Sequence, residues 1–398
     1  MPDTPGAQNR LQSIDILRGA IMIIMALDHV RDYFATDAQH FSPEDLTKTT
    51  AALFLTRWIT HFCAPVFMFL AGSGAFLWQQ RGHTGGEMSR FLVTRGLWLI
   101  FIELTVVRCL GFYFTFDYSL IVLLVIWAIG CSMIALAVLH YLPRRVLLGV
   151  SLAMIFLHNA FDKVQAEQLG SLGWLWHVLH QPGVAVMGSP VIFVGYPLIP
   201  WIGVMSAGYC FGELFLLDAE RRRAILLRLG SAITAAFLVV RALNIYGDAR
   251  HWAVQKSAAF TVLSFLNCTK YPPSLDYLLM TLGPAIIVLG LIEHVRIGMN
   301  NPLMVFGRVP MFYYVIHLPL IHFLALLAAG IQYGDLLFML KHPLPTLGGD
   351  AKTFPADYGF SLAGCYLWWA AIVVSLYFPC RWYANLKARR RDPWLSYL

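Results

Sequence analysis

The chain has 398 residues, of which 58% are hydrophobic and only 13% are charged, and its mean hydropathy is +0.64. Because soluble proteins carry about 25% charged residues, this composition excludes an ordinary soluble enzyme and predicts a polytopic membrane protein. The net charge of +7 does not indicate nucleic-acid binding, since the basic residues gather at the ends of apolar segments, as the positive-inside rule requires.

Ten apolar segments are long enough to be membrane spans. They cover residues 14–34, 51–79, 91–115, 118–141, 145–161, 190–216, 223–246, 274–295, 303–329 and 360–384. Shorter apolar pieces such as LGWLWHVL and AAFTVLSFL suit interfacial or re-entrant helices, and one of them could form an eleventh span. We therefore expect an all-α bundle of ten or eleven transmembrane helices, forming one domain over residues 1–398.

Basic residues predict the orientation of this bundle. Arginines recur in alternate loops, at residues 81–90, 144–145, 221–223 and 296, and again near the C-terminus. The intervening loops contain few cations, so both termini, residues 1–13 and 386–398, are expected on the cytoplasmic side. No signal peptide is evident at the N-terminus.

The seven cysteines fall mostly within apolar segments, without a C-x-x-C pair or a cysteine–histidine cluster of metal-binding spacing. This distribution predicts neither a disulfide framework nor a zinc site.

The first span is unusually polar, because it contains Asp15, Arg18, Asp28 and His29. Each ionisable group costs about 2.5–3.5 kcal/mol at mid-bilayer, so these side chains should face a protein interior or a wet cavity. Arg18 and His29 are eleven residues apart, which places them on one helical stripe about 16 Å apart along the axis. The alternative for Arg18 is a self-neutralising ion pair with Asp15 near the cytoplasmic interface.

Three histidines near this span are candidate catalytic or binding residues. His29 could be a general base, or a structural residue near a helix end. His40 follows eleven residues later in the polar loop DAQHFSPEDL, where a histidine often has no function. His61 shares a helix face with Arg57, and a structural contact to the first span explains this pair as well as a site does.

Two later segments repeat this polar character. Lys270 and Tyr271 precede two prolines at a helix entry, where they could contact an outer-side substrate or anchor the interface. In the ninth span, Arg308 and His322 are fourteen residues apart and about 40° off one stripe. They are expected to repeat the first span's arrangement of inner arginine and outer histidine, whereas His317 lies on the opposite face.

At these residues the sequence resembles a known family. Arg18-x₁₀-His29 resembles the signature of acyltransferase-3 membrane enzymes, and the wider pattern is similar to bacterial membrane proteins related to heparan-α-glucosaminide N-acetyltransferase. The segments that support this resemblance are SIDILRGAIMIIMALDH, APVFMFLAGSGAFL, GYPLIPWIGVMSAGYCFG, TKYPPSLDYLLMTLGP and NPLMVFGRVPMFYYVIH. The resemblance implies that acetyl-CoA enters from the cytoplasm and that the acetyl group passes to an acceptor on the far side.

The resemblance also implies roles for individual residues. It places the catalytic histidine at His40 and its partner at His29, which is asparagine in the heparan enzyme. This departure leaves open whether His29 or His40 is the base; Asp28 joins them as a candidate catalytic residue.

We therefore expect a membrane acyltransferase of the bacterial inner membrane. Arg18 and Arg308 would bind acyl-CoA, a co-substrate rather than a resident cofactor, and Lys270, Tyr271 and His61 would bind the acceptor. The expected partners are acyl-CoA, a glycan or envelope acceptor and the lipid bilayer, without nucleic acid, and a homodimer stays open.

The alternative function is a transporter or flippase for a cell-envelope precursor. Intramembrane charges and proline-broken helices fit a transporter equally well. A transporter predicts similarity between inverted halves of the chain, and no internal repeat is evident in the sequence.

Overall fold

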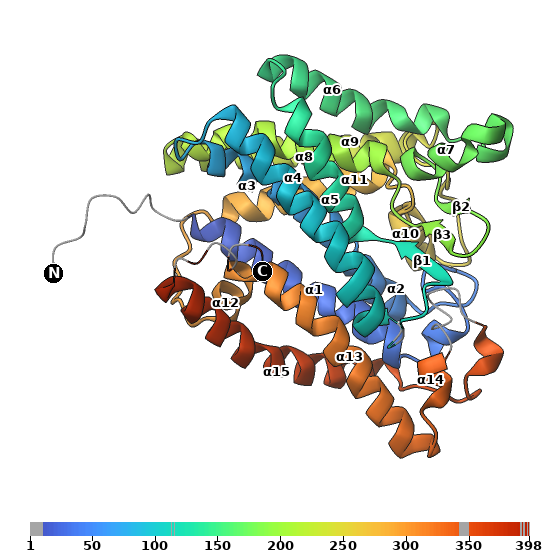
Figure 1. The fold of residues 1–398 in the computed structure, drawn as a ribbon. Coiled ribbons are helices and arrows are strands. Elements are labelled where there is room, and N and C mark those ends of the chain that lie inside the picture. The colour runs from blue at the N-terminus through green and yellow to red at the C-terminus, as the bar shows by residue number, and fades with distance from the viewer. Residues whose placement is uncertain are drawn as a thin grey trace.

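The computed structural model describes residues 11–112, 114, 116–341, 350–390, 392, 395 and 397. Most of them form helices that pack side by side (Figure 1). The α-helices are α1 (Gln12–Phe34), α2 (Ala51–Thr60), α3 (Cys63–Gln79), α4 (Gly85–Ile102), α5 (Val125–Leu139), α6 (Arg144–Leu157), α7 (Gly173–Leu179), α8 (Leu198–Phe211), α9 (Ala219–Leu243), α10 (Ala258–Leu266), α11 (Leu275–Leu291), α12 (Pro302–Arg308), α13 (Pro310–Tyr333), α14 (Leu337–Lys341) and α15 (Leu362–Arg389). The 3-10 segments are η1 (Asp37–Gln39), η3 (His158–Phe161), η4 (Ala166–Leu172), η5 (Gly212–Leu216) and η7 (Ala351–Thr353), and η2 (Glu103–Phe112) is a π-helix.

Length and composition confirm a helical membrane protein. Six helical stretches within the described residues are long and apolar enough to cross a bilayer: Ala51–Gln79, Arg144–Phe161, Leu198–Leu216, Ala219–Leu243, Pro310–Tyr333 and Leu362–Arg389. Two more apolar helices, α5 and α11, are shorter. The count of ten spans and the cytoplasmic termini stay predictions, and residues 1–10 and most of 391–398 lie outside the described residues.

The prediction of an all-α fold was wrong in one respect, because the chain also forms a small sheet. Its strands are β1 (Leu120–Leu123), β2 (Gly183–Val186) and β3 (Val191–Val194), in the order β1-β3-β2, with β1 parallel and β2 antiparallel to β3. The spans expected at 118–141 and 190–216 therefore begin as strands. Short apolar runs such as LIVL and VIFV suit a strand as well as a helix, and periodicity cannot separate the two.

α1 lies in the interior of the bundle, where it contacts α2, α3, α11, α12, α13 and α15 (Figure 1). Its contact with α12 is a direct approach of two backbones. A Cβ atom added to Gly19 would overlap the carbonyl group of Leu303, and one added to Gly307 would overlap that of Asp15. Small residues permit such close helix packing within a membrane, and they fix α12 beside the polar face of α1.

Gly307→Ala is expected to destabilise the protein, because the new methyl group meets backbone atoms of α1 that no side-chain rotation can move aside. Overpacking of this kind costs about 1–3 kcal/mol in the free energy of unfolding. Thermal unfolding in detergent would measure it. Gly149→Ala on α6 is the matched control, since no atom lies within 4 Å of its added Cβ; equal midpoints for the two variants would contradict the prediction.

Candidate active site

One large cavity follows the length of α1. Its volume is about 1530 Å³, and on the first helix it is lined at Leu11, Ile14, Asp15, Arg18, Met22, Met25, Asp28, His29, Arg31 and Asp32. Most of these positions recur every three or four residues, as one helical face does. From Leu11 to Asp32 the helix rises by about 30 Å, which is the thickness of the hydrocarbon core of a bilayer. The cavity therefore follows α1 over about that distance.

Positive charge gathers at the end of the cavity nearest the start of α1. Arg18 lies in the wall, 3.8 Å from the Asp15 carboxylate, and its Nη2 donates to the carbonyl of Leu70 at 3.4 Å. Other cationic residues from the loop after α3, from α4, α12 and α15 line the same cavity: Arg81, Arg95, Arg308 and Lys387. Guanidinium groups match phosphate oxygens in geometry and charge, so this end is suited to an anionic ligand.

Asp28 is the centre of an ion-pair network at the opposite end. Its carboxylate accepts two hydrogen bonds from Nη1 of Arg57, at 2.8 and 2.7 Å, and lies 3.0 Å from Nη2 of Arg31. Nζ of Lys270 is 4.0 Å away on a third side. Arg57 therefore makes a structural contact to the first span, which is one of the two explanations that the sequence left open for Arg57 and His61. Three cations held around one buried carboxylate fix the geometry of this wall.

Glu44 extends this network from the loop after α1. Its Oε1 accepts from Nε of Arg57 at 3.1 Å and lies 3.2 Å from Nε2 of His61, while Oε2 is 3.5 Å from Arg250. Burial alone would raise the pKa of Glu44, but the hydrogen bond with His61 and the charge of Arg57 outweigh it and hold that pKa well below its usual value. Glu44 is thus a carboxylate that ties the loop after α1 to α2.

The three candidate histidines occupy different places. His29 is half-buried in the cavity wall, and its ring lies 5.2 Å from the ring of His317. His40 also lines the cavity, but it is exposed, directly after η1. Among the described residues, no side-chain hydrogen bond is formed by either imidazole, so the ring nitrogen atoms of both are available to a ligand.

His61 is not at the cavity surface, although the sequence suggested that it binds substrate. It is only 1% exposed, and it contacts Glu44 through Nε2, while its backbone carbonyl accepts from the Tyr277 hydroxyl at 2.8 Å. These contacts place it behind the wall, where it can orient Glu44 but cannot touch a ligand in the cavity.

Lys270 and Tyr271 line the cavity close to Asp28. Nζ of Lys270 lies 5.3 Å from the centre of the Tyr271 ring, and the Tyr271 hydroxyl is 3.5 Å from that of Tyr196. Ser274 caps α11 by accepting from the Tyr277 amide, so the helix begins just after the two prolines. This position favours contact with a ligand over simple anchoring at the interface.

The predicted second stripe from Arg308 to His322 is wrong. The ninth span divides at Val309, so that Arg308 ends α12 and His322 belongs to α13. Counting 100° per residue fails across such a break. Arg308 lines the cavity, whereas His322 faces away: its Nδ1 lies 2.9 Å from the carbonyl of Gly111 and its ring packs on Tyr33.

The sequence did not single out several residues that the structure places at this site. Glu44, Tyr196, Arg81, Arg95 and Lys387 line the cavity. The first three lie in loops and Lys387 lies near the end of α15, where polar residues are common, whereas Arg95 lies within α4. The helical period predicts which residues of one helix share a face. It does not predict which residues of other segments contact that face.

Comparison with known families identifies the family of this chain. The family model described as heparan-alpha-glucosaminide N-acetyltransferase, catalytic, matches residues 10–248, which is more than half of the chain. No curated protein matches. The matched region holds Arg18, Asp28, His29 and His40, while Lys270 and Arg308 lie beyond it. The chain belongs to the family of the heparan-α-glucosaminide N-acetyltransferase catalytic domain, a family of membrane acetyltransferases.

Proposed function

We propose that this protein transfers an acetyl or other acyl group from cytoplasmic acyl-CoA to an amine or hydroxyl of a glycan-like acceptor on the outer face of a bacterial inner membrane. The observation that carries the proposal is the cavity along α1, with Arg18 and Arg308 toward one end and His29, His40 and Asp28 toward the other. Such a cavity lets a donor and an acceptor on opposite sides of a bilayer meet.

The cationic end is suited to the phosphate groups of coenzyme A. Arg18 and Arg308 would hold these groups, assisted by the other arginine and lysine side chains that line this end. The pantetheine arm would then lie beside the apolar residues Met22 and Met25 of α1. This placement brings the thioester toward His29 and the outer loop.

At the outer end, His40 would act as the general base. Its imidazole accepts the proton of the acceptor's amine or hydroxyl while that group attacks the thioester carbonyl. The new bond joins the acceptor to the carbonyl carbon, the carbon–sulfur bond breaks, and coenzyme A leaves as the thiol after protonation. Lys270 would stabilise the negative charge that develops on the carbonyl oxygen, and His29 would support His40 as its partner.

The test is acetyl transfer by the purified, full-length protein with radiolabelled acetyl-CoA and a panel of amino sugars and sugar hydroxyls. Incorporation of label into an acceptor, or hydrolysis of the thioester, is expected. The absence of both, together with no binding of coenzyme A, would contradict the proposal and favour a transporter. Trapping of labelled protein before acceptor is added distinguishes an acetyl-imidazole intermediate from direct transfer.

Arg18→Ala is expected to raise KM for acetyl-CoA about 10- to 100-fold, because a hydrogen bond to a charged group contributes about 1.5–3 kcal/mol. The variant kcat should change less, since Arg18 lies far from the histidines along α1. Arg90→Ala is the matched control: Arg90 is on α4, exposed and not part of the cavity wall. An equal effect of the two substitutions on KM would exclude a donor-binding role for Arg18.

A further inference from the structure

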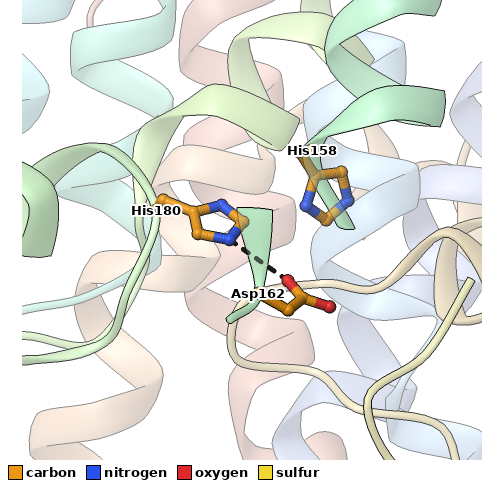
Figure 2. Close-up of side chains that lie close together, drawn as sticks. All are labelled: His158, Asp162 and His180. Carbon is orange, nitrogen blue, oxygen red and sulfur yellow. Dashed lines mark hydrogen bonds and ion pairs between the residues drawn. The ribbon is translucent and has the colours of Figure 1, made fainter. Parts of the chain in front are cut away.

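A second group of ionisable side chains lies apart from the cavity. His158 begins η3, Asp162 follows this segment, and His180 directly follows α7. Figure 2 shows the two imidazoles directed toward Asp162 and toward each other, with His180 bonded to the carboxylate. None of the three residues lines the cavity along α1.

Both histidines are buried, and several of their ring nitrogen atoms lack a well-formed hydrogen bond among the described residues. His158 and His180 are each 2% exposed. Nδ1 and Nε2 of His158 both lack a hydrogen bond of good geometry among the described residues, and so does Nδ1 of His180. A buried polar group without a hydrogen bond lowers the stability of the fold by about 1–3 kcal/mol. A ligand bound to these nitrogen atoms would remove that cost.

The donor set points to a metal ion. One ligand atom from each of the three residues lies within 4.8 Å of the others, and Nε2 of His180 is already 3.1 Å from Oδ1 of Asp162. In a tetrahedral zinc site with bonds of about 2.0–2.1 Å, ligand atoms are separated by about 3.3 Å. Small side-chain rotations would bring His158 to that distance. Two imidazoles and one carboxylate are typical zinc ligands, with the fourth position left to water.

The surroundings resemble the outer shell of a metal site. Asn159 donates through Nδ2 to Oδ2 of Asp162 at 2.9 Å, which leaves Oδ1 for the metal. The backbone of Pro273 lies beside the His158 ring and can accept from the nitrogen that does not face Asp162. Such partners fix the orientation of metal ligands.

We propose that His158, Asp162 and His180 bind a divalent transition-metal ion, with zinc the best match. The ion would join the end of α6 to α7. It would also hold the start of α11, because Oδ1 of Asn159 accepts from the Leu275 amide at 2.9 Å. Lys270 and Tyr271 lie just before that helix, so the ion would support one wall of the cavity from behind. This role is structural and goes beyond acyl transfer.

The test uses full-length protein purified in detergent without a polyhistidine tag, stripped with chelator and titrated with zinc against a chromophoric indicator. Wild type should bind one equivalent. Asn159→Ala removes an outer-shell partner and should weaken zinc binding by about 10- to 100-fold. His158→Asn and His180→Asn each remove a ligand, so each should weaken zinc binding by at least about 100-fold. His251→Asn is the matched control, because His251 is exposed and outside this cluster.

Two results would overturn the proposal: no stoichiometric zinc binding by wild type, or unchanged binding by both histidine variants. Gel filtration of each variant checks that it is folded. If a histidine variant does not fold, the Co²⁺ absorption spectrum of wild type, compared with that of Asp162→Asn, still decides the question. Because zinc is titrated without acyl-CoA, failure of the acyltransferase proposal would leave this result unaffected.

Discussion

His40→Ala is expected to lower kcat for acetyl transfer by about 10²- to 10⁴-fold, because that is the usual contribution of a positioned general base. His40 is exposed at the cavity and its imidazole makes no hydrogen bond within the described structure, so its removal should leave the fold intact. Initial rates at saturating acetyl-CoA, compared with the midpoint of thermal unfolding, would separate a loss of catalysis from a loss of stability.

His29→Asn is the informative companion to this variant. It introduces the residue that the heparan enzyme has at the corresponding position, and it keeps a polar side chain beside Asp28 and His317. We expect His29→Asn to lower kcat by much less than about 10²-fold, which is the smallest loss expected when a general base is removed. The opposite order, with His29→Asn inactive and His40→Ala near wild type, would reassign the base to His29. If neither change lowers kcat, general-base catalysis by histidine is excluded.

Asp28→Ala is expected to have the largest effect on stability. The Asp28 carboxylate pairs with Arg57 and Arg31 and lies near Lys270, and all four side chains are largely buried. Removing one partner of a buried ion pair costs about 3–5 kcal/mol, since the remaining charges stay desolvated. In this variant Glu44 and Asp32 still contact the two arginines. The expected loss in the free energy of unfolding is therefore close to about 3 kcal/mol. The apparent midpoint of thermal unfolding in detergent would measure it.

Asp45→Ala is the control for this measurement. Asp45 lies in the same loop after α1 as Glu44, but within the described part of the chain its carboxylate accepts hydrogen bonds only from the neighbouring Thr47. It should shift the midpoint far less than Asp28→Ala. Comparable midpoints would mean that the cations around Asp28 are well solvated, and the network would then have no structural role.

The polar face of α1 could be predicted from the sequence because one helix determines it. Charged residues within an apolar segment must face the protein interior, and the helical period groups Arg18 with His29. The structure confirms that these two residues line the same cavity. Family membership could be predicted for the same reason, since its motifs are local in sequence.

Features that depend on contacts between residues far apart in the sequence could not be predicted. Glu44 joins His61 and Arg250 only after folding, and His158, Asp162 and His180 have no spacing typical of a zinc motif. The break at Val309 is a different case. Pro310 signals it, since the residue before a proline disfavours the helical conformation, and applying this rule would have removed the false stripe to His322.

The polar face of α1 also bears on how the protein is made. α1 is not among the six helices whose composition suits a membrane crossing. Its carboxylate at Asp28 finds Arg57 on α2, and then Lys270 only just before α11. Arg31 on α1 itself also lies beside Asp28, so during synthesis the first helix precedes two of the three cations that surround this carboxylate. Its stable place in the bilayer depends on helices made later, which makes the folding of this bundle a collective step rather than a series of independent insertions.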